Sequence, residues 1–323
     1  MRGGPILELA GVSKDFDAPG GLMVRGRQKT VRAVSEVSLT LDCREVIGLV
    51  GESGCGKSTL GRLVAGLIKP SAGRITLEGR ARAELSFAQR RQWARDVQMV
   101  FQNPYASLNP RQTVRQILEE PLRVHRIVAT PNIRDRVEQL LERVGLDSSF
   151  ANRRPHQLSG GQCQRVGIAR ALSVAPKILV CDEAVSALDV SIQAQVLNLF
   201  ADLRESLSVA CIFISHDLGV VERLSDRVAV MYFGRIVELA SKCGLFEAPR
   251  HPYTQTLLAA VPRIGGPPKD NVVISGERPS ALNPPHGCHF HPRCPRAMTR
   301  CRDAAPGLRE VAPGQWAACH LYD

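Results

Sequence analysis

The chain has 323 residues, enough to bury one large hydrophobic core and a smaller unit beside it. Its hydrophobic fraction of 44% is ordinary for a globular protein, and no apolar run approaches the roughly 18 residues of a membrane-spanning helix. The net charge of +11 is compatible with nucleic acid, anionic lipid headgroups or nucleotides as partners and does not distinguish among them. The N-terminus lacks the apolar region of a signal peptide. We therefore expect a cytosolic address, where ten cysteines are reduced thiols or metal ligands and not disulfides.

The first fifty residues predict β-strands. Ile6–Leu9 opens one strand, and Val37–Leu41 alternates apolar and polar residues as a half-buried strand does. The glycine- and arginine-rich connection Pro19–Lys29 predicts an exposed loop. Phe16 precedes this loop, where an aromatic ring either stacks on an adenine base or packs as an edge-strand core residue.

A phosphate-binding loop is the strongest single motif. The segment Gly51–Ser58 fits G-x-x-x-x-G-K-[ST], between the apolar strand Val46–Val50 and a helix expected to bury Leu60, Leu63, Val64 and Leu67. In such a loop, backbone N–H groups point at phosphate oxygens, Lys57 reaches the β- and γ-phosphates, and Ser58 ligates Mg²⁺. The predicted nucleotide-binding residues here are Gly51, Ser53, Gly54, Cys55, Gly56, Lys57, Ser58 and Thr59.

The next stretch predicts two strands and then helices. Arg74–Glu78 forms one strand, and Val97–Phe101 forms another that ends at Gln102. Two prolines then break the regular structure, and residues 103–157 form a mostly helical insertion. Its apolar positions recur with helical period at Val114, Ile117, Leu118, Val137, Leu140, Leu141 and Val144.

Two further buried strands end in polar residues. A second glycine loop, Leu158–Gln162, precedes a helix with Val166, Ala169 and Leu172 on one face. Lys177–Glu183 is a strand ending in two carboxylates, with Ser186–Asp189 just after it. Ala210–His216 is a strand ending in a histidine.

This alternation of strands and helices predicts an α/β fold with a mainly parallel sheet covered on both faces. Ligands of such sheets bind at the carboxyl ends of the strands. The residues predicted to lie there are Lys57, Gln102, Asp182, Glu183 and His216.

The end of the chain changes character. Val228–Leu239 predicts a hairpin, and beyond it prolines and glycines accumulate, so we place a domain boundary near residue 245, giving units 1–245 and 246–323. Cys288, Cys294, Cys301 and Cys319 follow a C-x5-C-x6-C-x17-C spacing in this tail. Four thiolates suit zinc or an iron–sulfur cluster, and the lack of a C-x2-C pair favours [4Fe–4S]. His289 and His291 are spare ligands that leave zinc open, and four reduced thiols in a loop are the alternative.

The order of these motifs resembles the nucleotide-binding subunit of ABC transporters over residues 6–240. The L-S-G-G-Q sequence of Leu158–Gln162 is the most specific element of the resemblance. It implies a RecA-like P-loop ATPase core with an antiparallel β subdomain, the helical insertion and a small cysteine-rich C-terminal extension. Two such subunits would sandwich two ATP molecules between them.

Chemistry and resemblance together assign roles to the residues. Asp182 holds Mg²⁺ through water, and Glu183 polarises the attacking water as general base. Gln102 senses Mg²⁺ and this water, while the role of His216 at the γ-phosphate rests on the resemblance alone. Ser159, Gly160, Gly161 and Gln162 would bind the nucleotide of the opposite subunit, and Asp189 would couple the two halves. Cys163 stands where the family commonly has Arg or Gln, and we expect little effect from it.

A narrower resemblance covers nearly the whole chain. Residues 102–110, the run Ala184–Val190, the segment His251–Thr254 and the tail 287–295 are similar to dipeptide/oligopeptide and nickel import ATPases, whose tails share the cysteine pattern. Such importers combine a second ATPase subunit, identical or not, with two membrane permeases and an extracytoplasmic binding protein. The resemblance therefore implies a peripheral protein on the cytoplasmic face of the membrane that hydrolyses ATP with Mg²⁺ to power peptide import, without nucleic acid as partner.

Three alternative functions share some of these motifs: a soluble ABC-type ATPase acting on nucleic acid, a nickel importer ATPase and a small-molecule kinase. The first fits the charge of +11, but translation-type members carry two ATPase units and repair members carry long heptad segments, neither of which is present here. A kinase leaves Leu158–Gln162 unexplained. The identity of the transported substrate is not encoded in any motif of this chain.

Overall fold

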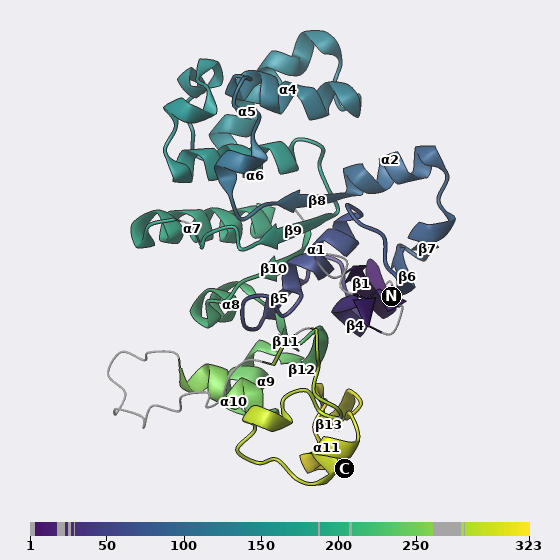
Figure 1. Cartoon of the computed structure of the whole chain (residues 1–323). Helices are drawn as coiled ribbons and strands as arrows, with labels where there is room; N and C mark the ends of the chain where they lie inside the picture. The colour runs from purple at the N-terminus through teal and green to yellow at the C-terminus, as the bar shows by residue number, and fades with distance from the viewer. Residues whose placement is uncertain are drawn as a thin grey trace.

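The computed structural model describes residues 4–17, 23–24, 27–28, 30–186, 188–206, 209–260, 279–280 and 282–323. Figure 1 shows a central body of sheets, a helical region above it and the C-terminal segment below it. None of the helices in these ranges combines the length and hydrophobicity needed to cross a lipid bilayer.

An eight-stranded sheet forms the centre, in the order β13-β14-β12-β11-β5-β10-β9-β8. Its strands span Val46–Val50 (β5), Val97–Val100 (β8), Ile178–Asp182 (β9), Ala210–Ile214 (β10), Arg227–Tyr232 (β11), Arg235–Ser241 (β12), Arg309–Ala312 (β13) and Gln315–Ala317 (β14). The run from β11 to β8 is parallel, whereas β12, β14 and β13 are added antiparallel. Every residue of β5 and β9 is buried, as expected for parallel strands covered on both faces.

A four-stranded antiparallel sheet packs beside it, in the order β4-β1-β6-β7. These strands span Leu7–Asp17 (β1), Thr30–Leu41 (β4), Ala72–Leu77 (β6) and Arg80–Ala81 (β7). The exposed loop predicted over residues 19–29 was wrong in part, because Met23–Val24 (β2) pairs with Arg27–Gln28 (β3) as a short hairpin. The rest of that stretch lies outside the described residues.

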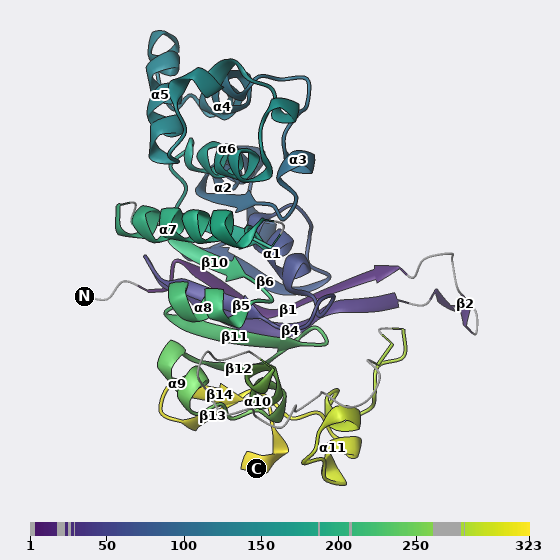
Figure 2. The same ribbon diagram turned by 90° about the vertical axis from the view of Figure 1, so that its left-hand side faces the viewer.

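Helices cover the faces of the large sheet and build the region above it (Figure 2). The α-helices span Lys57–Ala65 (α1), Phe87–Asp96 (α2), Pro104–Ser107 (α3), Val114–Val124 (α4), Ile133–Arg143 (α5), Gly160–Leu172 (α6), Val190–Ser206 (α7), Leu218–Leu224 (α8), Lys242–Glu247 (α9), Pro252–Ala259 (α10) and Arg300–Asp303 (α11). Short 3-10 turns lie at Arg82–Glu84 (η2), Thr130–Asn132 (η3), Ser148–Asn152 (η4), Pro155–Gln157 (η5), His291–Arg293 (η6) and His320–Tyr322 (η7).

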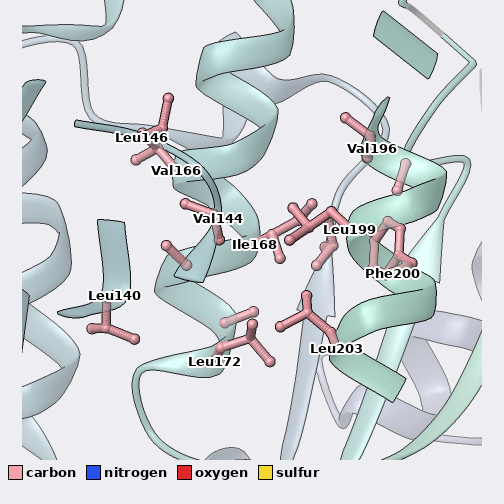
Figure 3. Packing of buried hydrophobic residues seen from close by; sticks show 14 of the residues in the cluster. Leu140, Val144, Leu146, Val166, Ile168, Leu172, Val196, Leu199, Phe200 and Leu203 are labelled. Carbon is pink, nitrogen blue, oxygen red and sulfur yellow. The ribbon is translucent and has the colours of Figure 1, made fainter. Parts of the chain in front are cut away.

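The predicted helical insertion forms as a packed unit. Thr113 begins α4 with a capping box, since its hydroxyl accepts from the N–H of Gln116. All seven apolar positions predicted from the helical period between 114 and 144 are buried. They join residues of α6 and α7 in one cluster, part of which Figure 3 shows around Ile168 and Phe200.

The helix after the phosphate loop ends sooner than predicted. Gly66 adopts a left-handed conformation with φ of 77° and closes α1 at Ala65. Leu60, Leu63 and Val64 are buried as expected, but Leu67 is 57% exposed, so its predicted burial was wrong. The N–H groups of Gly66 and Leu67 donate to the carbonyls of Leu63 and Arg62, which caps the helix, so Leu67 no longer follows the helical period that would bury it.

The C-terminal segment shares a hydrophobic core with the large sheet. Its strand β14 pairs with β12, and the ring of Phe290, 2% exposed, packs in a cluster with Val50, Tyr232 and Tyr253. A proline-rich tail too poor in apolar residues to build its own core therefore uses that of its neighbour. The boundary near residue 245 stays a prediction, but strand pairing and this cluster continue across it.

Replacing Phe290 with Ala should detach this segment. Loss of a buried phenyl ring costs ~3–5 kcal/mol, and here the cost falls on contacts of the C-terminal segment. We expect faster amide hydrogen exchange over residues 282–323, while β5 and β9 remain protected. Leu308→Ala, at a side chain 37% exposed, serves as the control. Unchanged exchange in Phe290→Ala would contradict the shared core.

Candidate functional site

The phosphate loop lies between the end of β5 and the start of α1, and its glycines are required by space as well as by conformation. Gly51 and Gly56 have φ of 147° and 108°. A Cβ at Gly51 would lie 2.1 Å from the carbonyl oxygen of Met231, and one at Gly56 would lie 2.2 Å from that of Ala33. Only glycine allows the loop to curl this closely against its neighbours.

Lys57 is held inside the loop. Its buried side chain donates from Nζ to the carbonyl oxygens of Gly51, at 2.7 Å, and Glu52, at 3.0 Å. The ammonium group is thus kept within the loop that would surround an anion. This placement fits a phosphate group of a nucleotide.

Ser58 and Asp182 meet beside Lys57. The Ser58 hydroxyl donates to Asp182 Oδ1 at 2.7 Å, and Asp182 is 3% exposed. Burial raises the pKa of the Asp182 carboxyl, although the Ser58 hydrogen bond and the charges of Arg62 and Lys57 oppose this. A hydroxyl oxygen and a carboxylate oxygen next to a phosphate-binding loop are donors that fit Mg²⁺.

Two further predicted residues, Gln102 and His216, meet at Glu183. Gln102 Nε2 donates to Glu183 Oε2 at 2.7 Å, and His216 Nδ1 lies 3.6 Å from Glu183 Oε1. Glu183 has a φ of 47°, a strained conformation for a residue other than glycine, held by its N–H donating to the Ile214 carbonyl at 3.0 Å. The carboxylate is therefore aimed by its backbone and by two side chains from different strand ends.

The Leu158–Gln162 segment makes its contacts elsewhere. Ser159 and Gln162 form a capping box at the start of α6, and the Tyr105 hydroxyl donates to the Leu158 carbonyl at 3.2 Å. A Cβ at Gly161 would lie 2.4 Å from Ile192 of α7, and one at Gly160 would lie 3.7 Å from Leu188. The helix start presents N–H groups as an anion site does, with Gly160 and Gly161 in its first turn.

The remaining predicted nucleotide residues keep their roles as predictions. Ser53 and Gly54 are exposed in the loop, and Thr59 is half-buried in α1. Phe16 lies near the end of β1 with 40% exposure, and the Lys14 ammonium is 5.1 Å from its ring centre. Asp189 is exposed just before α7, where its carbonyl accepts from Gln193 N–H, and Ala187 lies outside the described residues.

The four C-terminal cysteines gather in space. Burial, with the nearby thiols of Cys301, Cys319 and Cys294, raises the pKa of Cys288 to about 11. Burial also raises the pKa of Cys294 and of Cys319, and each interacts with Cys301. In the part of the chain that the structure describes, however, no group of three or more His, Cys, Asp or Glu side chains is arranged to hold a metal ion. The predicted cluster is therefore not confirmed.

Cys163 lies inside α6. It is fully buried, its Sγ lies 3.5 Å from the Pro155 carbonyl oxygen, and burial raises the pKa of its thiol to about 11. Such a thiol packs as a small apolar side chain.

Sequence reasoning missed two residues that contact the phosphate loop from the C-terminal segment. The Tyr253 hydroxyl accepts from the Glu52 N–H at 2.9 Å, and Arg293 forms an ion pair with the Glu52 carboxylate at 2.9 Å. One signal was available: an acidic residue inside an anion-binding loop needs a compensating cation. The sequence position of that cation, 241 residues away, was not predictable.

Comparisons with known proteins place these features in a family. The family model described as "ABC transporter" matches residues 34–186, and that described as "Oligopeptide/dipeptide transporter, C-terminal region" matches residues 237–301. The chain is 50% identical to the oligopeptide transport ATP-binding protein AppF of Bacillus subtilis, over 98% of this chain and 97% of that protein. It is 47% identical to the di/tripeptide transport ATP-binding protein DppF of Pseudomonas aeruginosa, over 98% and 97% of the two chains.

Solved structures agree on the fold. The dimeric ATP-binding cassette MJ0796, bound to ADP and phosphate, superposes with a TM-score of 0.64 at 28% identity, over 73% of this chain and 98% of that one. The CbiO1 protein of Clostridium perfringens superposes with the same TM-score at 27% identity, over 76% and 92%. The fold is thus the P-loop ATPase cassette, and the chain belongs to the ABC transporter ATP-binding proteins, in their oligopeptide and dipeptide transport branch.

Proposed function

We propose that this chain hydrolyses ATP to power the import of dipeptides or oligopeptides through a membrane ABC transporter. The observation that carries the ATPase chemistry is the pair of contacts Ser58–Asp182 and Gln102–Glu183 at the edge of the sheet. The peptide substrate is inferred from the relatives, since both AppF and DppF carry peptide transport in their names. These relatives favour neither a nucleic-acid ATPase, a nickel importer nor a small-molecule kinase.

Glu183 is the proposed general base for the attacking water. Ser58, Asp182 and Gln102 would hold Mg²⁺, which would neutralise charge on the phosphates. Glu183 accepts the proton of the attacking water, while Gln102 fixes one of its carboxylate oxygens. Lys57 and the loop N–H groups bind the phosphates, and His216 contacts the γ-phosphate beside Glu183.

A second subunit would complete the site. The Ser159–Gln162 helix start lies apart from the phosphate loop in its contacts, so it would serve the nucleotide of a partner, identical or not. The dimeric state of the MJ0796 cassette supports this arrangement. Asp189, exposed before α7, would link the two halves.

The membrane partners would dock on the helical region. Residues 103–157 connect Gln102 to the Leu158–Gln162 segment. A conformational change at the ATP site would therefore be transmitted to a permease bound to this region. Two permeases and an extracytoplasmic binding protein complete the proposed importer. The chain would then be peripheral, on the cytoplasmic face of the membrane.

The four gathered cysteines support a structural metal site in the same proposal. Buried thiols near one another repel as thiolates, and a bound cation would remove that repulsion. A [4Fe–4S] cluster is favoured over zinc by the spacing, although the described residues contain no group of three or more such side chains arranged for a metal ion.

Glu183→Gln tests the general base. The amide cannot accept a proton, so we expect ATP binding to be kept and hydrolysis to fall by ~10²–10⁴-fold. Lys57→Ala is the comparison, because it removes a cation inside the loop and should weaken nucleotide binding itself. Phosphate release and ATP affinity are measured for both. Turnover near that of the unchanged protein in Glu183→Gln would refute the assignment.

Cross-linking tests the membrane partner. Arg111, exposed in the helical region, is replaced by Cys in a variant whose exposed Cys43 and Cys243 are Ser. In membranes we expect cross-links from Arg111→Cys to a permease, and none from the control Arg74→Cys on β6. Cross-links only to RNA or ribosomal proteins would favour the nucleic-acid alternative.

Metal analysis tests the cysteines. Protein purified without oxygen is assayed for iron, sulfide and zinc and for the visible absorbance of an iron–sulfur cluster. We expect Cys301→Ser to lose the metal and keep nucleotide binding, while Cys243→Ser, at an exposed cysteine, keeps both. Folded, active protein without any of the three elements would rule the site out.

A further inference from the structure

Glu52, the second residue of the phosphate loop, is held by the C-terminal segment through an ion pair. Arg293 Nη2 donates to Glu52 Oε1 at 2.9 Å, and Nη1 donates to Oε2 at 3.0 Å. Two parallel bonds of this kind form the bidentate arrangement that planar guanidinium and carboxylate groups favour. Arg293 lies between Cys288 and Cys294, so the cysteine-bearing segment itself supplies this cation.

The ion pair is sheltered from water. The Arg293 side chain is 7% exposed and that of Glu52 is 22% exposed. Removing one member of such a pair takes away the charge that balances the other in a sheltered place, which costs far more than losing a surface ion pair. The contact is therefore part of the architecture of the loop.

The rest of Glu52 is held as well. Its N–H donates to the Tyr253 hydroxyl at 2.9 Å, and its carbonyl oxygen accepts from Lys57 Nζ at 3.0 Å. Tyr253 is fixed in turn, because Glu238 accepts the N–H groups of Arg250 and His251 at 2.7 and 2.8 Å and so anchors the start of α10. Backbone donor, backbone acceptor and side chain of one loop residue are thus all fixed by side chains from outside its own turn.

Charge explains why the loop requires this. An uncompensated carboxylate in a loop that binds polyphosphate repels the ligand, and the repulsion is strong where burial lowers the effective dielectric. Arg293 cancels the charge of Glu52, and the bidentate geometry also fixes where the loop backbone lies.

We propose that Arg293 is a positioning residue for ATP binding, which neutralises Glu52 and fixes the phosphate loop, and so ties nucleotide affinity to the fold of the cysteine-bearing segment. The proposal rests on the ATP-binding role of the loop proposed above. Arg293 acts through Glu52 and takes no part in the reaction itself.

The experiment measures the dissociation constant of a fluorescent ATP analogue on the full chain, with kcat at saturating ATP. We expect Arg293→Met to raise the dissociation constant by about ten-fold or more, with kcat within about two-fold. Adding Glu52→Gln to that variant removes the carboxylate that Arg293 balances and should restore affinity to within about three-fold. Arg293→Lys keeps the positive charge but loses the bidentate geometry of the guanidinium group. Its dissociation constant should lie between those of the unchanged protein and Arg293→Met.

Arg227→Met is the matched control. Arg227, the first residue of β11, forms an ion pair of 3.1 Å with Glu45, which directly precedes β5. Like the Arg293–Glu52 pair, this ion pair is partly buried. Its loss should leave ATP affinity unchanged. Circular dichroism confirms that each variant is folded, and if Arg293→Met does not fold, Arg293→Lys decides by the same affinity measurement.

Two results would overturn the inference: unchanged ATP affinity in folded Arg293→Met or Arg293→Lys, or no recovery on adding Glu52→Gln. The variant Lys57→Ala distinguishes a failure of the proposed role of Arg293 from a failure of the proposed function. If Lys57→Ala still binds ATP normally, the phosphate-loop assignment itself fails, whereas weakened binding there with normal binding in Arg293→Met refutes the role of Arg293 alone.

Discussion

The register of the parallel strands is the constraint on which the site depends. Asp182 pairs with Ile214, and Cys181 pairs with Val100, so β10, β9 and β8 end at nearly the same level. Glu183, His216 and Gln102 each follow one or two residues beyond that level and must project from one edge. A one-residue slip in any strand would turn its terminal residues to the other face and separate these side chains.

Charge balance is the second constraint. The edge of the sheet gathers the carboxylates of Asp182, Glu183 and Glu52 where a polyanion would bind. Each has a polar partner from elsewhere in the chain: Ser58 for Asp182, Gln102 for Glu183 and Arg293 for Glu52. These contacts hold the carboxylates in fixed directions, which an electrostatic site requires before a ligand arrives.

The helical region and the C-terminal segment contact the carboxyl edge of the large sheet in different ways. The helical region packs in an apolar cluster that it shares with Val46, Val100 and Leu179 of the large sheet. It follows directly on Gln102, and its Tyr105 hydroxyl donates to the Leu158 carbonyl. The C-terminal segment shares the core around Phe290 and contacts the phosphate loop directly. The first is therefore linked to Glu183 through the Gln102 side chain at its start, whereas the second holds the phosphate loop through Arg293 and Tyr253.

The sequence by itself determined the local elements and the chemistry of the site. Three features could be recognised in the sequence because each depends on interactions between residues only a few positions apart. They are the glycine spacing at Gly51–Ser58, the apolar strands ending in Asp182, Glu183 and His216, and the helical period from Val114 to Val144. The extent of α1 was misjudged at Leu67 because a single left-handed glycine outweighed an apolar period. What only the tertiary structure decided are the long-range partners: β14 beside β12, Phe290 beneath Tyr232, and Arg293 on Glu52. Such contacts join residues that no local period relates, and only the folded sheet brings them within reach of one another.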